Sequence, residues 1–456
     1  MYGGNFMKKY EIDMCNGPLF KQFVFFAIPL IFSEALQLLF NAADTVVVGK
    51  FAGESALAAV GSTSSLINLL LNLVIGLSMG AGVVVAKNYG SKDKKAVQES
   101  VHTAIATAIA SGIIMLFAGL FLTKPLLRMM KTPEDIINLS SLYMIIYFLG
   151  MPANMLYNFG ASVLRAAGDT KRPLFILTFA GVINVLLNLL LVIVFNLSVA
   201  GVAIATITAE TISAFLILRI LTNTPGMLRL KWKSVKIHRD RFLEIVKIGL
   251  PAGVQGILFN ISNVLIQSSV NSFGPLVIAA NTASVAIEGF VNTTLNALYQ
   301  ATLNFTSQNY GAKKFARIDK ILILSLILSF ICGGFFGFGA YIFGTPLLGI
   351  WISSKDAISY GLIRLSVIGI SYSLCGLMDA FVGSLRGLGL SIVPTIITLF
   401  GACLFRTLWV FTIFANNHTL YTLYMSYPIS WILTSGTLGL YYLYERKKLF
   451  KTYVSI

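Results

Sequence analysis

The sequence repeats itself at a fixed distance of 221 residues. Asn88–Gly90 recurs as Asn309–Gly311, and a second motif recurs at the same offset, with Leu164, Arg165, Gly168 and Pro173 repeated as Leu385, Arg386, Gly389 and Pro394. One offset across markers this far apart preserves the spacing inside each half, which chance matches of short words would not do. The chain is therefore expected to contain two copies of one architecture.

Composition places both copies in a membrane. Hydrophobic residues make up 56% of the 456 residues and charged residues only 11%, which is about half the charged fraction of a typical soluble domain. The charges gather between apolar stretches of about 20 residues, each long enough to cross ~30 Å of hydrocarbon. We predict an all-α membrane protein with twelve spans, at residues 22–49, 62–87, 97–122, 137–165, 173–195, 199–220, 245–270, 278–306, 319–343, 358–386, 392–415 and 420–443.

The basic residues predict the orientation of these spans. With the N-terminus in the cytoplasm, alternate connections collect 27 of the 34 Lys and Arg residues, and only 5 fall in the connections on the outer side. Both termini are therefore expected on the cytoplasmic side of the cell (inner) membrane. Basic loops that face anionic lipid also explain the net charge of +16, so a nucleic-acid partner is not expected.

An even number of spans in each half gives both halves the same orientation. We therefore expect two six-helix lobes, related by a pseudo-twofold axis along the membrane normal, around a central cavity. The lobes are placed at 1–220 and 245–456, with a basic cytoplasmic linker at 221–244. Pro29 and Pro251 lie in the first helix of each lobe, where proline deletes a backbone hydrogen bond and predicts a hinge, with a static kink as the alternative.

Five carboxylates lie well inside the predicted spans: Glu34, Asp44, Glu210, Glu288 and Asp379. A charge near the bilayer centre costs about 3 kcal/mol on insertion scales, so each is a candidate for function. Asp44 shares its depth with Asn184, Asn188 and Thr206. These four groups form an all-oxygen acceptor set that suits Na+ or a proton on Asp44. A hydrogen-bonded cluster that only holds helices together is the alternative.

Several motifs resemble those of the MATE (multidrug and toxic compound extrusion) transporters. They are the stretch FNAADTVVVGKFAGESALAAVGS, the pair LRAAGD and LRGLGL, and both NYG motifs. The resemblance implies an antiporter without a cofactor, which exports cationic or amphipathic small molecules as H+ or Na+ enters. For the DinF-like branch it implies an ion site at Asp44, Asn184, Asn188 and Thr206, with Gln37 and Asn158 lining the substrate cavity. Asn188 departs from that branch, where an aspartate is common at this position.

The second half matches the NorM-like branch only in part. Asp379 matches an aspartate of that branch, but the seventh span offers Gln255 and no glutamate. Asp379 is expected to bind a cationic substrate or a second proton, with a hydrogen bond toward Arg386 as the alternative. Glu34, Glu288 and Gln255 are assigned to the substrate cavity, and a bond to a neighbouring helix is the alternative for Glu288. The sequence names no partner for Glu210.

The main alternative function is a flippase for a lipid-linked oligosaccharide or peptidoglycan precursor, built on the same superfold. Such a protein generally needs a cationic cavity for pyrophosphate, whereas the central charges here are mostly acidic. An enzyme is not expected, because the three histidines are scattered and no metal or nucleophile cluster is visible. The absence of a GxxxxGK[ST] motif argues against ATP drive. Repeated lobes would let one chain in the lipid form the whole pathway as a monomer.

Overall fold

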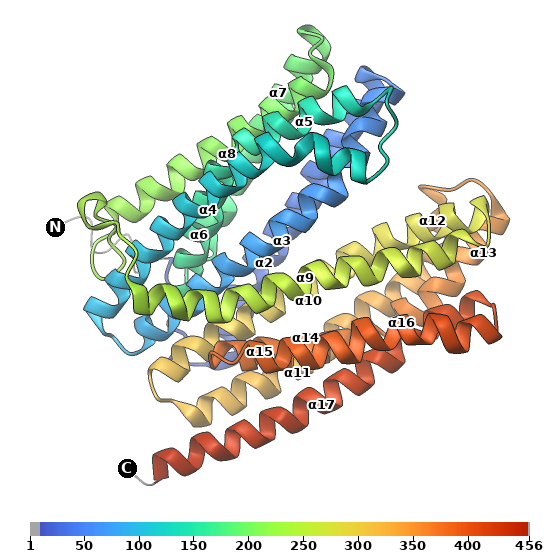
Figure 1. Cartoon of the computed structure of the whole chain (residues 1–456). Coiled ribbons are helices and arrows are strands. Elements are labelled where there is room, and N and C mark those ends of the chain that lie inside the picture. The colour runs from blue at the N-terminus through green and yellow to red at the C-terminus, as the bar shows by residue number, and fades with distance from the viewer. Residues whose placement is uncertain (1–9, 455–456) are drawn as a thin grey trace. The chain divides into compact units, whose positions relative to one another are not determined.

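The computed structural model describes residues 10–454, with side chains described up to residue 449, and within this range every regular element is a helix (Figure 1). The first half of the chain forms α2 (Leu19–Val47), η1 (Val48–Ala52), α3 (Glu54–Gly90), α4 (Lys94–Met129), α5 (Ile137–Leu149), α6 (Met151–Ala166), α7 (Lys171–Leu189), η2 (Leu190–Val194) and α8 (Ser198–Asn223).

The second half repeats this order with more interruptions. Its elements are η3 (Trp232–Ser234), α9 (Arg239–Asn271), α10 (Pro275–Gly311), α11 (Phe315–Ile342), α12 (Gly344–Gly349), α13 (Lys355–Arg364), η4 (Leu365–Gly369), α14 (Tyr372–Gly387), α15 (Ile392–Thr398), η5 (Leu399–Leu404), α16 (Phe405–Trp409), η6 (Val410–Phe414) and α17 (Leu420–Val454). Here η3 is a 3-10 turn, and every other η element is a π-helical turn.

The helices follow the predicted spans. Among the described residues, ten helices are long and apolar enough to cross a membrane, and the bent pair α5 and α6 forms an eleventh span with a bend of 48°. The twelfth predicted span corresponds to α17, whose 35 residues are long enough to cross but include many Tyr, Ser and Thr residues. The prediction of an all-helical membrane protein is confirmed.

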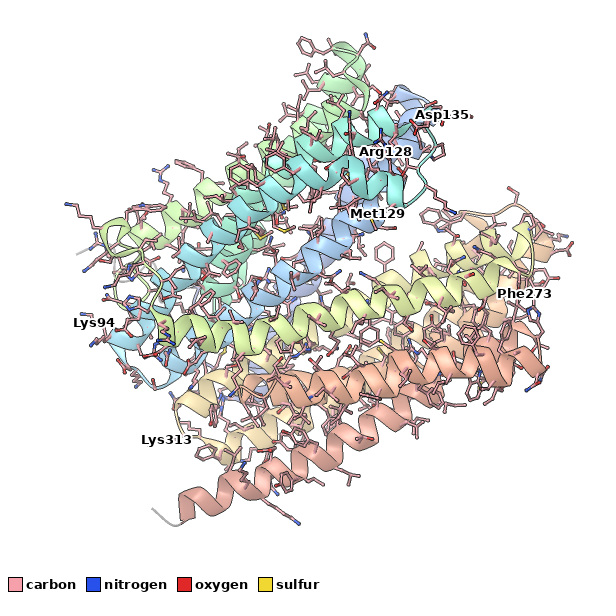
Figure 2. The ribbon with its side chains drawn as sticks, in the orientation of Figure 1. Lys94, Arg128, Met129, Asp135, Phe273 and Lys313 are labelled. Carbon is pink, nitrogen blue, oxygen red and sulfur yellow. The ribbon has the colours of Figure 1, made fainter. Side chains whose placement is uncertain are left out.

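The surface of these helices is that of a protein in lipid. Large apolar side chains such as Phe121 and Phe335 are 73% and 72% exposed in the middle or outer parts of long helices, where an aqueous protein would place polar groups. Charged residues instead mark helix ends: Lys94 begins α4 and Arg128 lies in its last turn (Figure 2). The Asp93 side chain caps α4 by accepting a hydrogen bond from Ala96 N at 3.0 Å.

The described chain forms two compact units. The first comprises residues 10–14 and 28–253, and the second comprises residues 15–27 and 254–454. Two of the boundaries fall inside helices and close to proline: one precedes Pro29 by a single residue in α2, and the other follows Pro251 in α9. Both prolines lie inside continuous helices, so neither ends its helix.

Small residues hold the beginning of α9 in the first unit. Gly76 and Gly80 lie one turn apart on α3, and Gly249 and Gly253 lie one turn apart on α9. A Cβ atom at Gly76 would lie 2.4 Å from Gly253 N, and one at Gly80 would lie 2.5 Å from Ile245 O. Such pairs of small residues let two membrane helices approach at backbone distance.

The predicted linker, residues 221–244, also packs on the first unit. Lys231 N donates a hydrogen bond to His102 Nε2 of α4 at 3.1 Å, and His238 N donates to Thr103 Oγ1 at 3.1 Å. Because both donors are backbone amides, the linker is held as a defined segment rather than as a free interfacial chain. Helix α9 begins within it, at Arg239.

Candidate functional site

The four residues of the predicted ion site meet in the first unit, where α2, α7 and α8 come together. Asn188 Nδ2 donates a hydrogen bond to Asp44 Oδ1 and a second, of 3.2 Å, to Asn184 Oδ1. Asn184 Nδ2 donates in turn to Thr206 Oγ1 at 3.3 Å, and the Thr206 hydroxyl donates to Val202 O at 2.9 Å. The structure therefore joins all four side chains in one hydrogen-bonded chain.

The local sequence explains how these groups come together. Asn184 and Asn188 are one turn apart on α7 and lie on the same face, and both are buried. Three residues earlier, Gly181 leaves room for Phe40 of α2: a Cβ atom there would lie 1.9 Å from Phe40 Cε2. Phe40 is one turn from Asp44, so this close approach of α2 to α7 brings the carboxylate to the two amides.

Both helices that carry the site widen directly after it. Helix α2 passes into the π-helical turn η1 four residues after Asp44, and α7 passes into η2 two residues after Asn188. The two turns contact each other. Single π-helical turns occur frequently at functional sites. The polar chain thus ends beside the part of the first unit whose helical hydrogen bonding is irregular.

The negative charge of Asp44 is not compensated by an ion pair within the described residues. The Asn188 Oδ1 atom is buried and accepts no hydrogen bond there. A carboxylate inside a span without a basic partner requires a proton or a bound cation to offset its desolvation. A free acceptor next to it can bond to either.

The residues assigned to the substrate cavity of the first half lie on α2 and α6. Gln37 is exposed and lies two turns before Asp44 on the same face of α2, and Glu34 on the same helix is half-buried. Asn158 on α6 is half-buried, and its Nδ2 donates at 2.9 Å to Asn154 Oδ1. The cavity role of these residues stays a prediction.

The structure supplies the partner that the sequence did not name for Glu210. Asn154 Nδ2 of α6 donates to Glu210 Oε1 of α8 at 2.7 Å. Asn154 and Asn158 lie one turn apart, a spacing that in hindsight marks a second pair of amides like Asn184 and Asn188. Nothing in the sequence shows that this pair faces α8, because the contact joins residues 56 positions apart.

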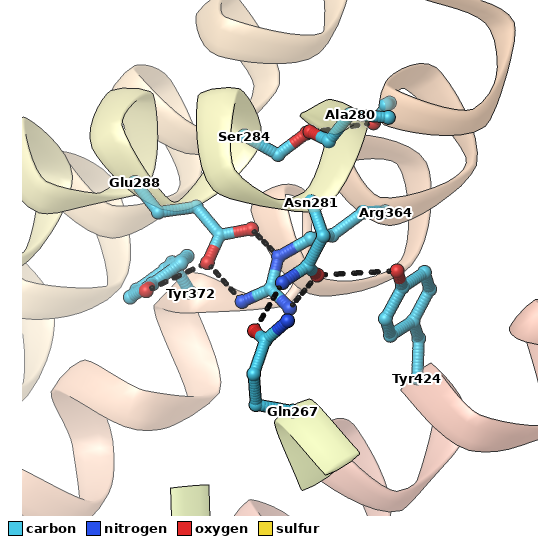
Figure 3. A network of polar contacts seen from close by, with 9 residues as sticks. Gln267, Ala280, Asn281, Ser284, Glu288, Arg364, Tyr372 and Tyr424 are labelled. Atoms are coloured by element: carbon cyan, nitrogen blue, oxygen red, sulfur yellow. Dashed lines mark hydrogen bonds and ion pairs between the residues drawn. The ribbon is translucent and has the colours of Figure 1, made fainter. Parts of the chain in front are cut away.

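In the second unit, Glu288 belongs to a buried network rather than to an open surface (Figure 3). Arg364 Nε donates to Glu288 Oε1 at 2.8 Å and Arg364 Nη2 donates to Glu288 Oε2 at 2.7 Å. Arg364 Nη1 also donates to Asn281 Oδ1 at 2.8 Å, and the Tyr424 hydroxyl donates to the same atom at 3.2 Å. Of the two roles considered for Glu288, the structure shows the bond to a neighbouring helix, and a role in the cavity stays a prediction.

Asp379 is left with little compensation in the second unit. Its one hydrogen bond among the described residues is a weak one from the Cys375 thiol, with 4.0 Å between Sγ and Oδ2. The alternative bond to Arg386 is not formed, because Arg386 donates instead to Tyr299 Oη and to Gln255 Oε1, both at 2.8 Å. Gln255 therefore positions Arg386, while binding of a substrate or a proton by Asp379 stays a prediction.

The second mid-span arginine, Arg406, is also enclosed by its own unit. Its guanidinium carbon lies 4.1 Å from the Tyr427 ring centroid and 5.5 Å from the Trp431 centroid, and Nε donates to Ser430 Oγ at 2.9 Å. Arg364 and Arg406 are both buried. Neither provides the exposed cationic cavity that binding of pyrophosphate would require.

The family model described as MatE matches the chain twice, over residues 29–190 and 251–412. The chain is 28% identical to the probable multidrug resistance protein YpnP of Bacillus subtilis, covering 98% of this chain and 99% of that protein. It is 29% identical to the probable multidrug resistance protein YoeA of the same organism, covering 82% of each. It also resembles a solved outward-facing multidrug resistance MATE family transporter of the MOP superfamily, with a TM-score of 0.90, 19% identity and coverage of 97% and 99%.

Proposed function

The chain belongs to the MatE family, that of the MATE transporters, and from this premise we propose that it is a secondary active antiporter that exports drugs. It is a multi-pass membrane transporter and not an enzyme. The proposed reaction moves cationic or amphipathic small molecules out of the cell across the inner membrane. The inward movement of H+ or Na+ supplies the free energy.

The observation that carries this proposal is the hydrogen-bonded chain from Asp44 to Thr206. It places one carboxylate without a basic partner, two buried amides and a hydroxyl at a single point of the first unit. A cluster that only held helices together would gain nothing from the carboxylate, because amides and hydroxyls form the same bonds without the cost of burying a charge.

Antiport requires that ion and substrate stabilise different conformations of the protein. Two predicted hinges provide a place for such a change, since Pro29 and Pro251 lie next to the points where α2 and α9 pass from one unit to the other. Pro29 O already accepts a hydrogen bond from Ser33 Oγ at 2.8 Å, so the backbone there is supported by a side chain. A bend at Pro29 would move Glu34, Gln37 and Asp44 together.

The nature of the cargo follows from the relatives and from the charges. Proteins named multidrug resistance proteins match most of the chain. Asp379 is a half-buried carboxylate that forms no ion pair with a basic residue in the described part of the chain. Acidic groups of this kind attract organic cations. The protein is proposed to act as a monomer in the lipid.

Reconstitution in liposomes tests the proposal. Ethidium export would be followed under an imposed proton gradient and then under a sodium gradient, which identifies the coupling ion. Asp44→Asn is expected to abolish driven export while the protein still binds ethidium, and Asp135→Asn, in the exposed connection after α4, serves as the control. Export driven equally well in the Asp44→Asn variant would contradict the proposal, and lipid-linked precursor movement without any gradient would favour a flippase.

A further inference from the structure

Glu210 forms a second polar chain in the first unit, separate from that of Asp44. Asn158 Nδ2 donates at 2.9 Å to both Asn154 O and Asn154 Oδ1, and Asn154 Nδ2 donates at 2.7 Å to Glu210 Oε1. Because Asn154 Oδ1 accepts the hydrogen bond from Asn158, the NH2 group of the Asn154 amide is turned toward Glu210. Asn158 thus donates to Asn154, and Asn154 in turn donates to the Glu210 carboxyl group.

The other oxygen of Glu210 has no partner. Glu210 Oε2 is buried and forms no hydrogen bond among the described residues. It lies against the break between α5 and α6: a Cβ atom at Gly150 would be 3.3 Å from Oε2 and 2.4 Å from Ile207 Cγ2. A side chain at position 150 would therefore clash with Ile207 and crowd the Glu210 carboxyl group.

The two polar chains are adjacent along one helix face. Thr206 ends the Asp44 chain and Glu210 begins the second chain one turn later on α8. In the predicted orientation α8 runs inward, so Glu210 lies about 6 Å nearer the cytoplasm than Thr206. Tyr143 and Tyr147 on α5 lie within electrostatic range of both carboxylates, with ring centroids 6.2 Å apart.

The ligand set at Glu210 suits a proton and not a metal cation. Glu210 Oε1 accepts from an N–H donor, and Oε2 lies beside Gly150. A hard cation needs several oxygen ligands, whereas a proton needs only the unpartnered oxygen.

We propose that Glu210 is a second proton-binding residue of the first unit, placed between the Asp44 chain and the predicted substrate residue Asn158. The inference rests on the proposed antiport. Protonation forms an O–H bond at Oε2 and neutralises the buried carboxylate. When a cationic substrate occupies the cavity near Asn158, the proton leaves toward the cytoplasm, and the carboxylate is then stabilised by the Asn154 donor and the substrate charge.

Proton release on substrate binding tests this assignment. Purified protein in weakly buffered detergent would be titrated with ethidium while an indicator dye reports pH. Because binding and proton release are linked, Glu210→Gln is expected to release about one proton fewer per bound ethidium than the wild type. Glu210→Asp retains a carboxyl group and is expected to retain that proton. Thr208→Val on the same helix is the matched control, because in the described part of the chain its hydroxyl donates to Ile204 O and to no other group.

The outcomes separate this inference from the proposed function. Equal proton release by Glu210→Gln and the wild type, with ethidium still bound, overturns the role of Glu210. If the wild type shows no gradient-driven export at all, the proposed antiport itself fails. Should Glu210→Gln not fold, infrared difference spectra of the wild type and of Glu210→Asp replace it: an ethidium-dependent loss of a protonated carboxyl C=O band whose frequency differs between the two proteins supports the assignment, and an identical band in both contradicts it.

Discussion

Arg364→Met removes the cation from the buried ion pair of the second unit and leaves Glu288 in place. The wild-type pair is bidentate, at 2.8 and 2.7 Å, and the two residues are 6% and 3% exposed. Loss of one partner of such a pair costs about 3–5 kcal/mol, because the remaining charge stays buried without compensation. For a unit of this size, the melting temperature should fall by about 6–20 °C.

A second variant separates this cost from the cost of lost packing. In Glu288→Met with Arg364→Met, both charges are replaced by apolar side chains of similar length, and Asn281 Oδ1 keeps its hydrogen bond from the Tyr424 hydroxyl. Replacing a whole buried pair by apolar residues is often neutral, so the double variant should regain most of the stability lost by the single one. The difference is the coupling energy of a double-mutant cycle.

The melting temperature of both variants in detergent is measured from the fraction of protein that remains monodisperse after heating. Ethidium export by the double variant adds a functional readout, because a pair that only holds helices together can be replaced without loss of transport. A melting temperature unchanged in Arg364→Met would refute the reasoning about burial. Restored stability with abolished export would return Glu288 to the substrate pathway.

Two further predictions concern the first unit. Gly76→Ala is expected to destabilise the protein by about 1–3 kcal/mol through overpacking against α9. In the control variant Gly334→Ala, the added Cβ atom meets open space, so stability should be unchanged or raised by about 0.5–1 kcal/mol. Equal melting temperatures of the two variants would contradict the close packing of α3 against α9. Burial raises the pKa of Glu11, which lies before the first span, so the folded state binds the Glu11 proton more tightly than the unfolded state does. Stability is therefore lost as the pH rises from the pKa of glutamate in the unfolded chain, about 4.3, through the higher pKa in the folded state. Glu11→Gln should therefore raise the melting temperature relative to the wild type at pH 7 but not at pH 3, and a gain of the same size at both pH values would argue against it.

The spans of this protein are determined by local sequence. Apolar stretches of the required length mark the long helices from α2 to α11, because in hydrocarbon the backbone can satisfy its hydrogen bonds only within the helix. The internal repeat likewise matches the two segments that the family model recognises. Both features depend on neighbouring residues, so they can be predicted without any knowledge of which helices touch.

The Asp44 group is an intermediate case. Depth along each span brought Asp44, Asn184, Asn188 and Thr206 to one level, and the structure joins them by hydrogen bonds. Depth cannot show which face of a helix is turned toward a neighbour. The contact depends on Gly181 letting Phe40 approach, which is a property of the packed pair of helices.

Tertiary structure alone decided the partners of the remaining buried charges. Glu288 and Glu210 look alike in sequence, each being one carboxylate inside an apolar helix. One is neutralised by Arg364, 76 residues away. The other receives a single amide donor from Asn154, and its second oxygen has no partner within residues 10–454. Hydropathy fixes how deep a residue lies because it depends on the local segment, whereas partnership depends on the rotation and packing of helices that are distant in sequence.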